Sequence, residues 1–313
     1  MSDIEVVAAY DVNSSKVGRD LSEAIFEEPN NTLKFCEVPE TGIIVEPGVV
    51  NDGVGKFVKD IIDVVPDSVD FEKSLKNSGA EILINLLPVG SDEAVKFYAQ
   101  SAINTKIGFI NCIPVFIARD EIWYNKFKEN KVPLIGDDIK SQVGATIVHR
   151  VLAQLFSDRG VKLKNTYQLN VGGNMDFLNM LEEDRLETKR TSKTSSVTSV
   201  ANNGKGIDPD NVRIGPSDYV KWLEDRKKAF IRLEGESFGG APLNIEVQLE
   251  VWDSPNSAGV TIDAVRYMKF FAENDDLASL DLVSAWLMKA PAKAHKDSDV
   301  LMKLHELTHI EKN

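Results

Sequence analysis

The chain has 313 residues, with 36 lysines and arginines against 49 aspartates and glutamates, so its formal net charge is −13. This length accommodates about two domains of roughly 100–200 residues each, and a hydrophobic content of 42% is that of an ordinary globular protein. The negative charge disfavours nucleic-acid and anionic-membrane partners, and two cysteines with no leader or apolar span predict a reduced, cytoplasmic protein.

The first part of the chain alternates short apolar runs with amphipathic stretches, which is typical of a βαβ domain with a parallel sheet. We predict strands at residues 4–10, 43–45, 82–87, 107–110 and 132–135, and helices at 16–28, 56–65, 70–77, 92–103 and 117–129. Pro88 and Pro114 closely follow two of these strands. A parallel sheet places its ligand-facing loops at such positions.

The pattern changes after residue 141. We predict helices at 142–156, 258–273, 277–288 and 300–309, strands at 167–171, 229–233 and 243–252, and a short helix followed by a loop across 189–206. In residues 243–252, apolar side chains alternate strictly with asparagine, glutamate and glutamine. That alternation predicts a sheet with one face exposed to water, unlike the doubly covered sheet of the first part.

Asp11 ends the first predicted strand. In a dinucleotide-binding fold, an acid at the tip of the second strand accepts hydrogen bonds from the adenosine ribose, although Asp11 would equally open a turn or cap a helix. A Gly-x-Gly-x-x-Gly turn should lie about 20 residues earlier, but ten residues precede Asp11 and none is glycine. We interpret the first part as a nucleotide-binding domain that begins at its second strand.

The sequence His305-Glu306-Leu307-Thr308-His309 matches the zinc-protease pattern His-Glu-x-x-His. A catalytic zinc of this kind needs a third protein ligand, and only four residues follow His309. The end of a chain is also a poor place for a rigid metal site. We interpret the match as chance and predict no metal.

Residues 136–146 run from a predicted strand into a predicted helix. Ser141 is a good N-cap residue, and the first helical amides with Lys140 would bind an anion; a plain cap with solvated charges is the alternative. Lys189 and Lys193 would share one side of a helix. They, Lys227 and Lys289 are each also compatible with an ordinary surface position, whereas Asp253 directly follows the alternating strand.

Several runs of sequence resemble the myo-inositol-phosphate synthase family in its shorter archaeal and actinobacterial form. They are residues 136–146 (GDDIKSQVGAT), 170–180 (NVGGNMDFLNM), 192–194 (SKT), 214–218 (IGPSD), 252–259 (WDSPNSAG), 86–90 (LLPVG) and 287–291 (LMKAP). The resemblance implies an α/β fold with a Rossmann-like parallel-sheet nucleotide domain and an inserted α+β catalytic and oligomerisation domain. We place the first at residues 1–141 and 254–313, and the second at 142–253.

The resemblance also implies an activity. The family is an NAD-dependent isomerase that converts glucose 6-phosphate to inositol phosphate. It oxidises the sugar at carbon 5, enolises the ketone, closes the ring by an internal aldol step and returns the hydride, so NAD is regenerated in each turnover. The family is homotetrameric.

By the same resemblance, the sugar is surrounded by Lys189, Lys193, Lys227 and Lys289. Lys227 and Lys289 are the leading choices for proton transfer in the hydride step and for oxyanion stabilisation, because a lysine of lowered pKa acts as a base and charged lysines stabilise alkoxides and enolates. Asp138 and Asp253 would orient a lysine or a hydroxyl. The implied substrate-binding residues are Lys140, Ser141, Gln142, Thr146, Asn174 and Asp176. The NAD cleft would be lined by Asp11, Pro88, Val89, Gly90, Asn111, Pro114 and Asp138.

One departure from the family concerns the first strand and its glycine-rich turn, which lie under the NAD pyrophosphate. That strand is central in the usual order, so we expect a slot with unpaired backbone groups, a truncated chain and weakened NAD affinity. The alternatives are a non-catalytic family member acting as a scaffold or regulatory subunit, an unrelated dehydrogenase and, last, a zinc peptidase. The retained lysines favour the enzyme.

Overall fold

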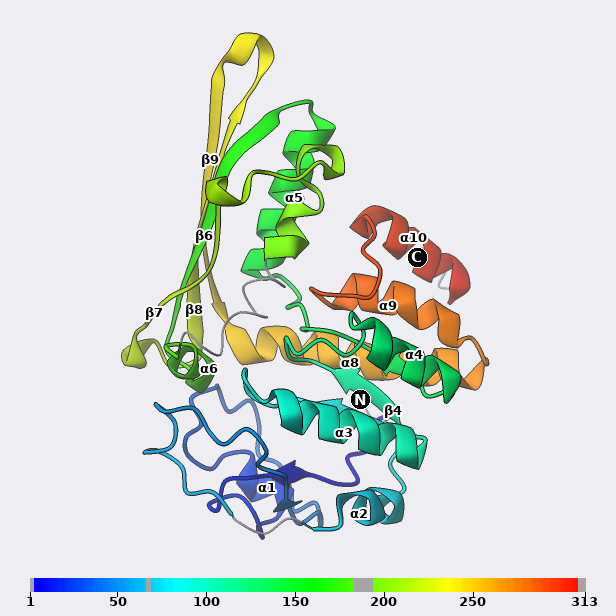
Figure 1. The fold of residues 1–313 in the computed structure, drawn as a ribbon. Helices are drawn as coiled ribbons and strands as arrows, with labels where there is room; N and C mark the ends of the chain where they lie inside the picture. Colours follow the sequence, from blue (N-terminus) through cyan, green and yellow to red (C-terminus); the bar gives the residue numbers. More distant parts are fainter. Residues whose placement is uncertain (1–2, 66–68, 183–193, 309–313) are drawn as a thin grey trace.

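A computed structural model describes residues 3–65, 69–182 and 194–308. Figure 1 shows a lower part, built of helices and short strands, from which a tall sheet with one long helix rises. None of the described helices is both long and apolar enough to cross a membrane.

The lower part contains two separate parallel sheets. One pairs β1 (Tyr10–Asp11) with β2 (Glu46–Pro47), and the other has the order β3 (Ile82–Asn85), β4 (Gly108–Asn111), β5 (Leu134–Ile135). The parallel pairing confirms the predicted βαβ class. Over the described residues, no strand ladder joins β1 to β3, which is the position of the expected slot.

Helices cover both faces of the three-stranded sheet. These helices are α2 (Phe71–Ser78), α3 (Asp92–Thr105), α4 (Glu121–Glu129), α8 (Asp253–Glu273), α9 (Leu280–Leu287) and α10 (Asp297–Leu307), whereas α1 (Leu21–Ala24) lies beside the two-stranded sheet (Figure 1). Phe109 of β4 packs in a core with α2, α3 and α4, whereas the next residue, Ile110, packs with α8, α9 and α10. Successive residues of a strand point to opposite faces, so β4 is buried on both sides, as predicted for this sheet.

The predicted strand 4–10 is wrong except at its end, because only Tyr10 and Asp11 pair. Val6 is 52% exposed, and Leu86, just after β3, is 68% exposed. Residues 4–9 and strand β3 both begin beside α8, because Arg266 of α8 pairs with Asp3 and Lys269 of α8 pairs with Glu81. Apolar side chains that a central strand would cover therefore face outward.

Two predicted helices of the first part are also wrong. Residues 16–28 contain only the four-residue helix α1, and residues 56–65 form hydrogen-bonded turns. The second segment ends in extended backbone, because Val65 donates from its amide to the carbonyl of Val12 and Val64 bridges Asn13. Pairing with the chain after β1 therefore replaces the last helical turn.

The upper part is a four-stranded sheet of order β7 (Val212–Tyr219), β6 (Lys162–Gly172), β8 (Arg226–Glu236), β9 (Pro242–Trp252). β6 and β7 are parallel and the other pairs are antiparallel. Helix α5 (Ala145–Asp158) packs on one face, where Ile231 and Leu233 join a core with Phe156. Asn244, Glu246, Gln248 and Glu250 of β9 are exposed. The predicted one-sided sheet is thus confirmed.

The remaining elements are short. Residues 194–198 are helical, α6 covers Met175–Asn179, and single 3-10 turns occur at Ala201–Gly204, Pro209–Asn211, Lys221–Leu223, Phe238–Gly240 and Leu277–Ser279.

Candidate functional site

A cavity of about 570 Å³ lies between the lower and upper parts of the molecule. The loops after β1, β3, β4 and β5 form one wall, and the N-terminal ends of α5, α6 and α8 form much of the other, with Lys227 of β8 and Lys289 after α9. The first wall is the carboxyl edge of the parallel strands, where such folds bind ligands.

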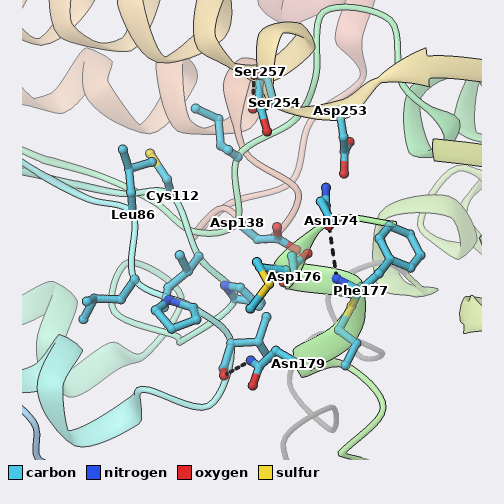
Figure 2. Close-up of a pocket in the computed structure, with 18 of the residues that line it drawn as sticks. Leu86, Cys112, Asp138, Asn174, Asp176, Phe177, Asn179, Asp253, Ser254 and Ser257 are labelled. Atoms are coloured by element: carbon cyan, nitrogen blue, oxygen red, sulfur yellow. Dashed lines mark hydrogen bonds between the residues drawn. The ribbon is translucent and has the colours of Figure 1, made fainter. Parts of the chain in front are cut away.

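Two lysine–aspartate pairs face this cavity. The Nζ of Lys289 donates to Oδ1 of Asp138 over 2.7 Å, and the Nζ of Lys227 donates to Oδ1 of Asp253 over 2.9 Å. Neither lysine side chain is more than 18% exposed. In Figure 2, Asp138, Asp253, Asn174 and Asp176 lie around a common space. The structure therefore brings together four of the predicted catalytic residues.

Lys227 stays positively charged. Burial alone would lower its pKa, but the charge and hydrogen bond of Asp253 outweigh burial and raise the pKa above its ordinary value. The lowered pKa expected of a base is therefore not a property of Lys227 in this arrangement. A held cation is instead a stabiliser of negative charge on a bound oxygen.

Among the described lysines, Lys140 has a lowered pKa, because burial brings the pKa to about 8. Its Nζ donates to the carbonyl oxygens of Ala285 and Trp286, over 2.9 and 3.0 Å, at the end of α9. The prediction that Lys140 is free to hold an anion is thus not met, because its ammonium caps a helix C-terminus. Lys140 still lines the cavity.

Asp138 is held by an unusual loop after β5, with a φ of 61°. The preceding carboxylate, Asp137, is fully buried and accepts from the side-chain amide of Asn111 over 2.7 Å and from three backbone amides of residues 117–119. The backbone carbonyl of Asp138 accepts from the amide of Lys289 over 2.7 Å. Asn111, predicted in the NAD cleft, is therefore a buried support outside the cavity wall.

The start of α5 differs from the prediction. Ser141 is not its N-cap: Gly144 holds that position, and the helix begins at Ala145. Asn256 of α8 holds the intervening loop in place. Its backbone carbonyl accepts from the amide of Gln142 over 2.7 Å, and its Oδ1 accepts from the amide of Val143 over 3.1 Å. Because these hydrogen bonds set the chain direction, the N-cap lies three residues after the serine.

The first turn of α5 faces the cavity. Gly144, Ala145, Thr146 and Ile147 line it, as does Ser141, and the N-cap residue Gly144 has no side chain to cap the first helical amides. Backbone amides at a helix N-terminus attract anions. Gln142 does not line the cavity; its side chain lies against Gly259 of α8.

The predicted cofactor wall is partly assembled. Asp11, Pro88, Val89 and Pro114 line the cavity, but Gly90 does not. The Oδ1 of Asp11 accepts from the amides of Val12 and Asn13 over 2.7 and 2.9 Å, so the carboxylate opens a turn, which is the alternative role for this residue. It faces the cavity nonetheless, with Lys16 3.7 Å from Oδ2.

Asn174 and Asp176 begin α6 and line the cavity. The Oδ1 of Asn174 accepts from the amide of Phe177 over 3.1 Å, which fixes the helix start (Figure 2). Asn179, at the other end, donates to the carbonyl of Val89 over 2.9 Å and so ties α6 to the loop after β3. The sequence prediction missed Asn179, because a lone asparagine within an apolar run carries no spacing signal.

Other cavity-lining residues were also not predicted. They include Asn13, Lys16, Cys112, Gln168, Ser254 and Ser257. Ser254 and Ser257 follow Asp253 closely, which was the available signal. Burial raises the pKa of the Cys112 thiol to about 12, so this thiol stays protonated and unreactive.

Lys189, Lys193 and His309 lie outside the described residues. Over the residues that are described, no group of three or more histidine, cysteine, aspartate or glutamate side chains is placed to hold a metal ion.

Comparison with known proteins gives a consistent result. A family model described as myo-inositol-1-phosphate synthase matches residues 144–254. Inositol-3-phosphate synthase of Mycolicibacterium smegmatis is 56% identical over 94% of this chain and 82% of that protein. The Mycobacterium tuberculosis protein of the same name is 53% identical over 97% of this chain and 83% of that protein. The fold matches the crystal structure of a myo-inositol-1-phosphate synthase-related protein from Thermotoga maritima, with a TM-score of 0.78, 24% identity, and coverage of 100% of this chain and 88% of that one.

Proposed function

The chain belongs to the myo-inositol-phosphate synthase family, and we propose that it isomerises glucose 6-phosphate to inositol phosphate within the cavity described above. The observation that carries this proposal is the placing of two lysine–aspartate pairs, Lys227–Asp253 and Lys289–Asp138, in one cavity at the carboxyl edge of the parallel strands. An isomerisation through alkoxide and enolate stages needs fixed cations beside the reacting oxygens.

The N-terminus of α5 is our proposed site for the substrate phosphate. The helix has 14 residues, and its first turn faces the cavity. Ser141 and Thr146 line the same wall and offer hydroxyl donors. With the phosphate bound there, the sugar carbons would extend toward the two lysine–aspartate pairs.

In this arrangement the lysines stabilise charge and the aspartates keep them in place. The ammonium of Lys227 or Lys289 stabilises the oxyanion that develops as a hydroxyl is oxidised or a ketone enolised. A proton leaving the sugar passes to the carboxylate of a pair, because the paired Lys227 already carries its own proton. Each pair is only partly exposed, which strengthens these interactions relative to bulk water.

We propose NAD as the cofactor, placed against the loops after the parallel strands. The chain supplies the Asp11 carboxylate and apolar walls from Pro88, Val89 and Pro114, which fit a ribose and a planar ring. Among the described residues, no glycine precedes Asp11, and β1 and β3 belong to separate sheets. When bound, NAD would supply the hydride acceptor and donor for the oxidation and the later reduction.

We further propose the domain division given above and a homotetramer. The outer face of the upper sheet supports the second point. Leu169 and Phe230 are cross-strand partners on it, flanked by Tyr167 and Val171, and Phe230 is 36% exposed. Apolar side chains on an otherwise charged sheet face are typical of a subunit contact. Light scattering of the wild type and of Phe230→Lys tests this assembly.

The function is tested by incubating the chain with glucose 6-phosphate and NAD and separating sugar phosphates by anion exchange. We expect inositol phosphate without net NADH. Accumulating NADH would instead identify a dehydrogenase. If the chain binds neither NAD nor glucose 6-phosphate in calorimetry and forms no product, the non-catalytic alternative replaces our proposal.

A further inference from the structure

Asp225 is a buried carboxylate outside the cavity wall, in the short loop before β8. It is 1% exposed. Its Oδ1 accepts from the Nδ2 of Asn174 over 3.1 Å and from the Oγ of Ser254 over 2.8 Å. Its Oδ2 accepts from the Oγ1 of Thr32 over 2.9 Å and from the amide of Ser254 over 3.0 Å. Both oxygens therefore have two donors.

These donors come from three distant segments of the chain. Asn174 begins α6, Ser254 is in the first turn of α8, and Thr32 belongs to the lower part of the molecule. Asn174 and Ser254 both line the cavity, where Figure 2 shows them near Asp253. Asp225 thus lies behind the point at which these segments meet.

Backbone contacts reinforce the same junction. The amide of Asp253 donates to the carbonyl of Asp225 over 2.9 Å, and the amide of Asp225 donates to the carbonyl of Asn31 over 3.2 Å. The side chain of Asn31 donates to the carbonyl of Gly173 over 3.1 Å. Residues 31–32 therefore lie against both the loop of Asp225 and the loop before α6.

Gly173 shows how closely these loops approach. A Cβ at this position would lie 2.5 Å from the backbone nitrogen of Glu224, which is closer than atoms in contact can be. The loop that carries Asn174 is therefore packed directly on the loop that carries Asp225. Small displacements of one loop must be transmitted to the other.

We propose that Asp225 is a positioning residue for the reaction, fixing Asn174 and the Lys227–Asp253 pair relative to each other and making that alignment depend on Thr32. The inference rests on the proposed function for its kinetic consequences. Asp225 acts through Asn174, Lys227 and Asp253, and its position in the chain places it next to the lysine–aspartate pair. Lys227 is two residues after it, and Asp253 bonds to its carbonyl.

Only a carboxylate satisfies this site. A carboxylate has about four lone-pair positions and no donor, so it can accept all four hydrogen bonds. An asparagine of the same size would turn one oxygen into an amide donor, which would face an N–H that can only donate: that of Asn174 on one side or the backbone amide of Ser254 on the other. A buried donor left without a partner is costly, so the loops would shift to relieve the conflict.

The test is Asp225→Asn, with Asp210→Asn as the matched control, since Asp210 is an exposed acid on the same sheet's periphery. We expect kcat to fall roughly 10–100-fold in Asp225→Asn, because ångström-scale misplacement of reacting groups has that effect. The KM for glucose 6-phosphate should change less than about threefold, since the α5 subsite is untouched. Asp210→Asn should match the wild type.

Thr32 gives a second variant that removes one donor only. Thr32→Ala should lower kcat by a smaller factor, and Thr32→Ser, which restores the hydroxyl, should recover it. The proposal is overturned if a folded Asp225→Asn protein keeps kcat within about twofold of the control, or if KM rather than kcat carries the change.

Hydrogen exchange separates this proposal from the proposed function. Amides of residues 31–33 and 173–176 should exchange faster in Asp225→Asn than in Asp210→Asn. If the wild type makes no inositol phosphate, the proposed function fails while the exchange result still decides whether Asp225 joins these segments. Unchanged exchange at both segments would refute the positioning role of Asp225, whatever the activity.

Discussion

β6 pairs with β8 along ten registered residue pairs and with β7 along seven, whereas β1 pairs with β2 through two residues only. The upper sheet also has a continuous core against α5, while Val6 and Leu86 beside the lower sheets stay largely exposed. This difference shows which part of the site is held by extensive strand pairing and which part is not. Lys227 and Asp253 lie at the well-paired end of β8 and β9. The wall proposed for a dinucleotide is formed by loops of the two separate lower sheets.

The largest expected effect is on catalysis at the well-paired end. Replacing Lys227 by methionine removes a held cation, and we expect kcat to fall roughly 10²–10³-fold, as when one preorganised oxyanion donor is lost. Lys228→Met is the matched control, since the next lysine of β8 pairs with Glu250 away from the cavity. Steady-state kinetics with glucose 6-phosphate measure both. Equal losses in the two variants would contradict the assignment.

Core truncation should separate the two regions by stability. Leu233 of β8 is fully buried, so Leu233→Ala should lower the free energy of unfolding by about 2–5 kcal/mol. Val6→Ala, at a side chain that is 52% exposed, should change it by less than about 0.5 kcal/mol. Urea unfolding measures both. A Val6→Ala loss as large as that of Leu233→Ala would mean that residues 4–9 are packed as a central strand.

A smaller effect is expected from pH. Burial lowers the pKa of His149 to about 4, while its ring bonds Gln168 and Thr166 of β6. The unfolded histidine, with an ordinary pKa, binds more protons than the folded one between these values, so its contribution is complete above about pH 6.5. It is lost as pH falls toward 4, by at most about 3 kcal/mol.

The variant that checks this pH dependence is His149→Gln, measured by urea unfolding between the two pKa values. Its stability should fall less steeply with decreasing pH than that of the wild type. His295→Gln, at an exposed histidine, should keep the wild-type slope. If the stability of His149→Gln fell with decreasing pH as steeply as that of the wild type, groups other than His149 would account for the pH dependence.

The sequence predicted the elements whose pattern is local. The alternation in residues 243–252 gave β9, and the amphipathic run 92–103 gave α3, because each pattern repeats at the period of its own backbone. β7 was missed because its Gly215-Pro216 pair interrupts any alternation. Residues 4–10 looked like a buried central strand, but a central strand needs partners on both sides, and the position of those partners is not a local property.

The site was predictable where runs of the sequence resemble the family. Asp138, Asp253, Lys227 and Lys289 converge as expected. Ser141 and Asn111 show the limits of local reasoning. Asn256, more than a hundred residues away, sets where α5 begins, and the buried Asp137 recruits Asn111 away from the cavity. Asp225 gave no signal, because its role comes only from three segments that meet in the fold.

Residue-resolved amide hydrogen exchange on the full chain tests the contrast between the two regions most directly. We expect amides in the middle of β6 and β8 to exchange at least about 100-fold more slowly than those of residues 4–11 and β3, because local opening is easier where few backbone pairs must break. Equal protection of β1, β3 and the upper strands would contradict the account, since it would mean that the lower sheets are joined into one.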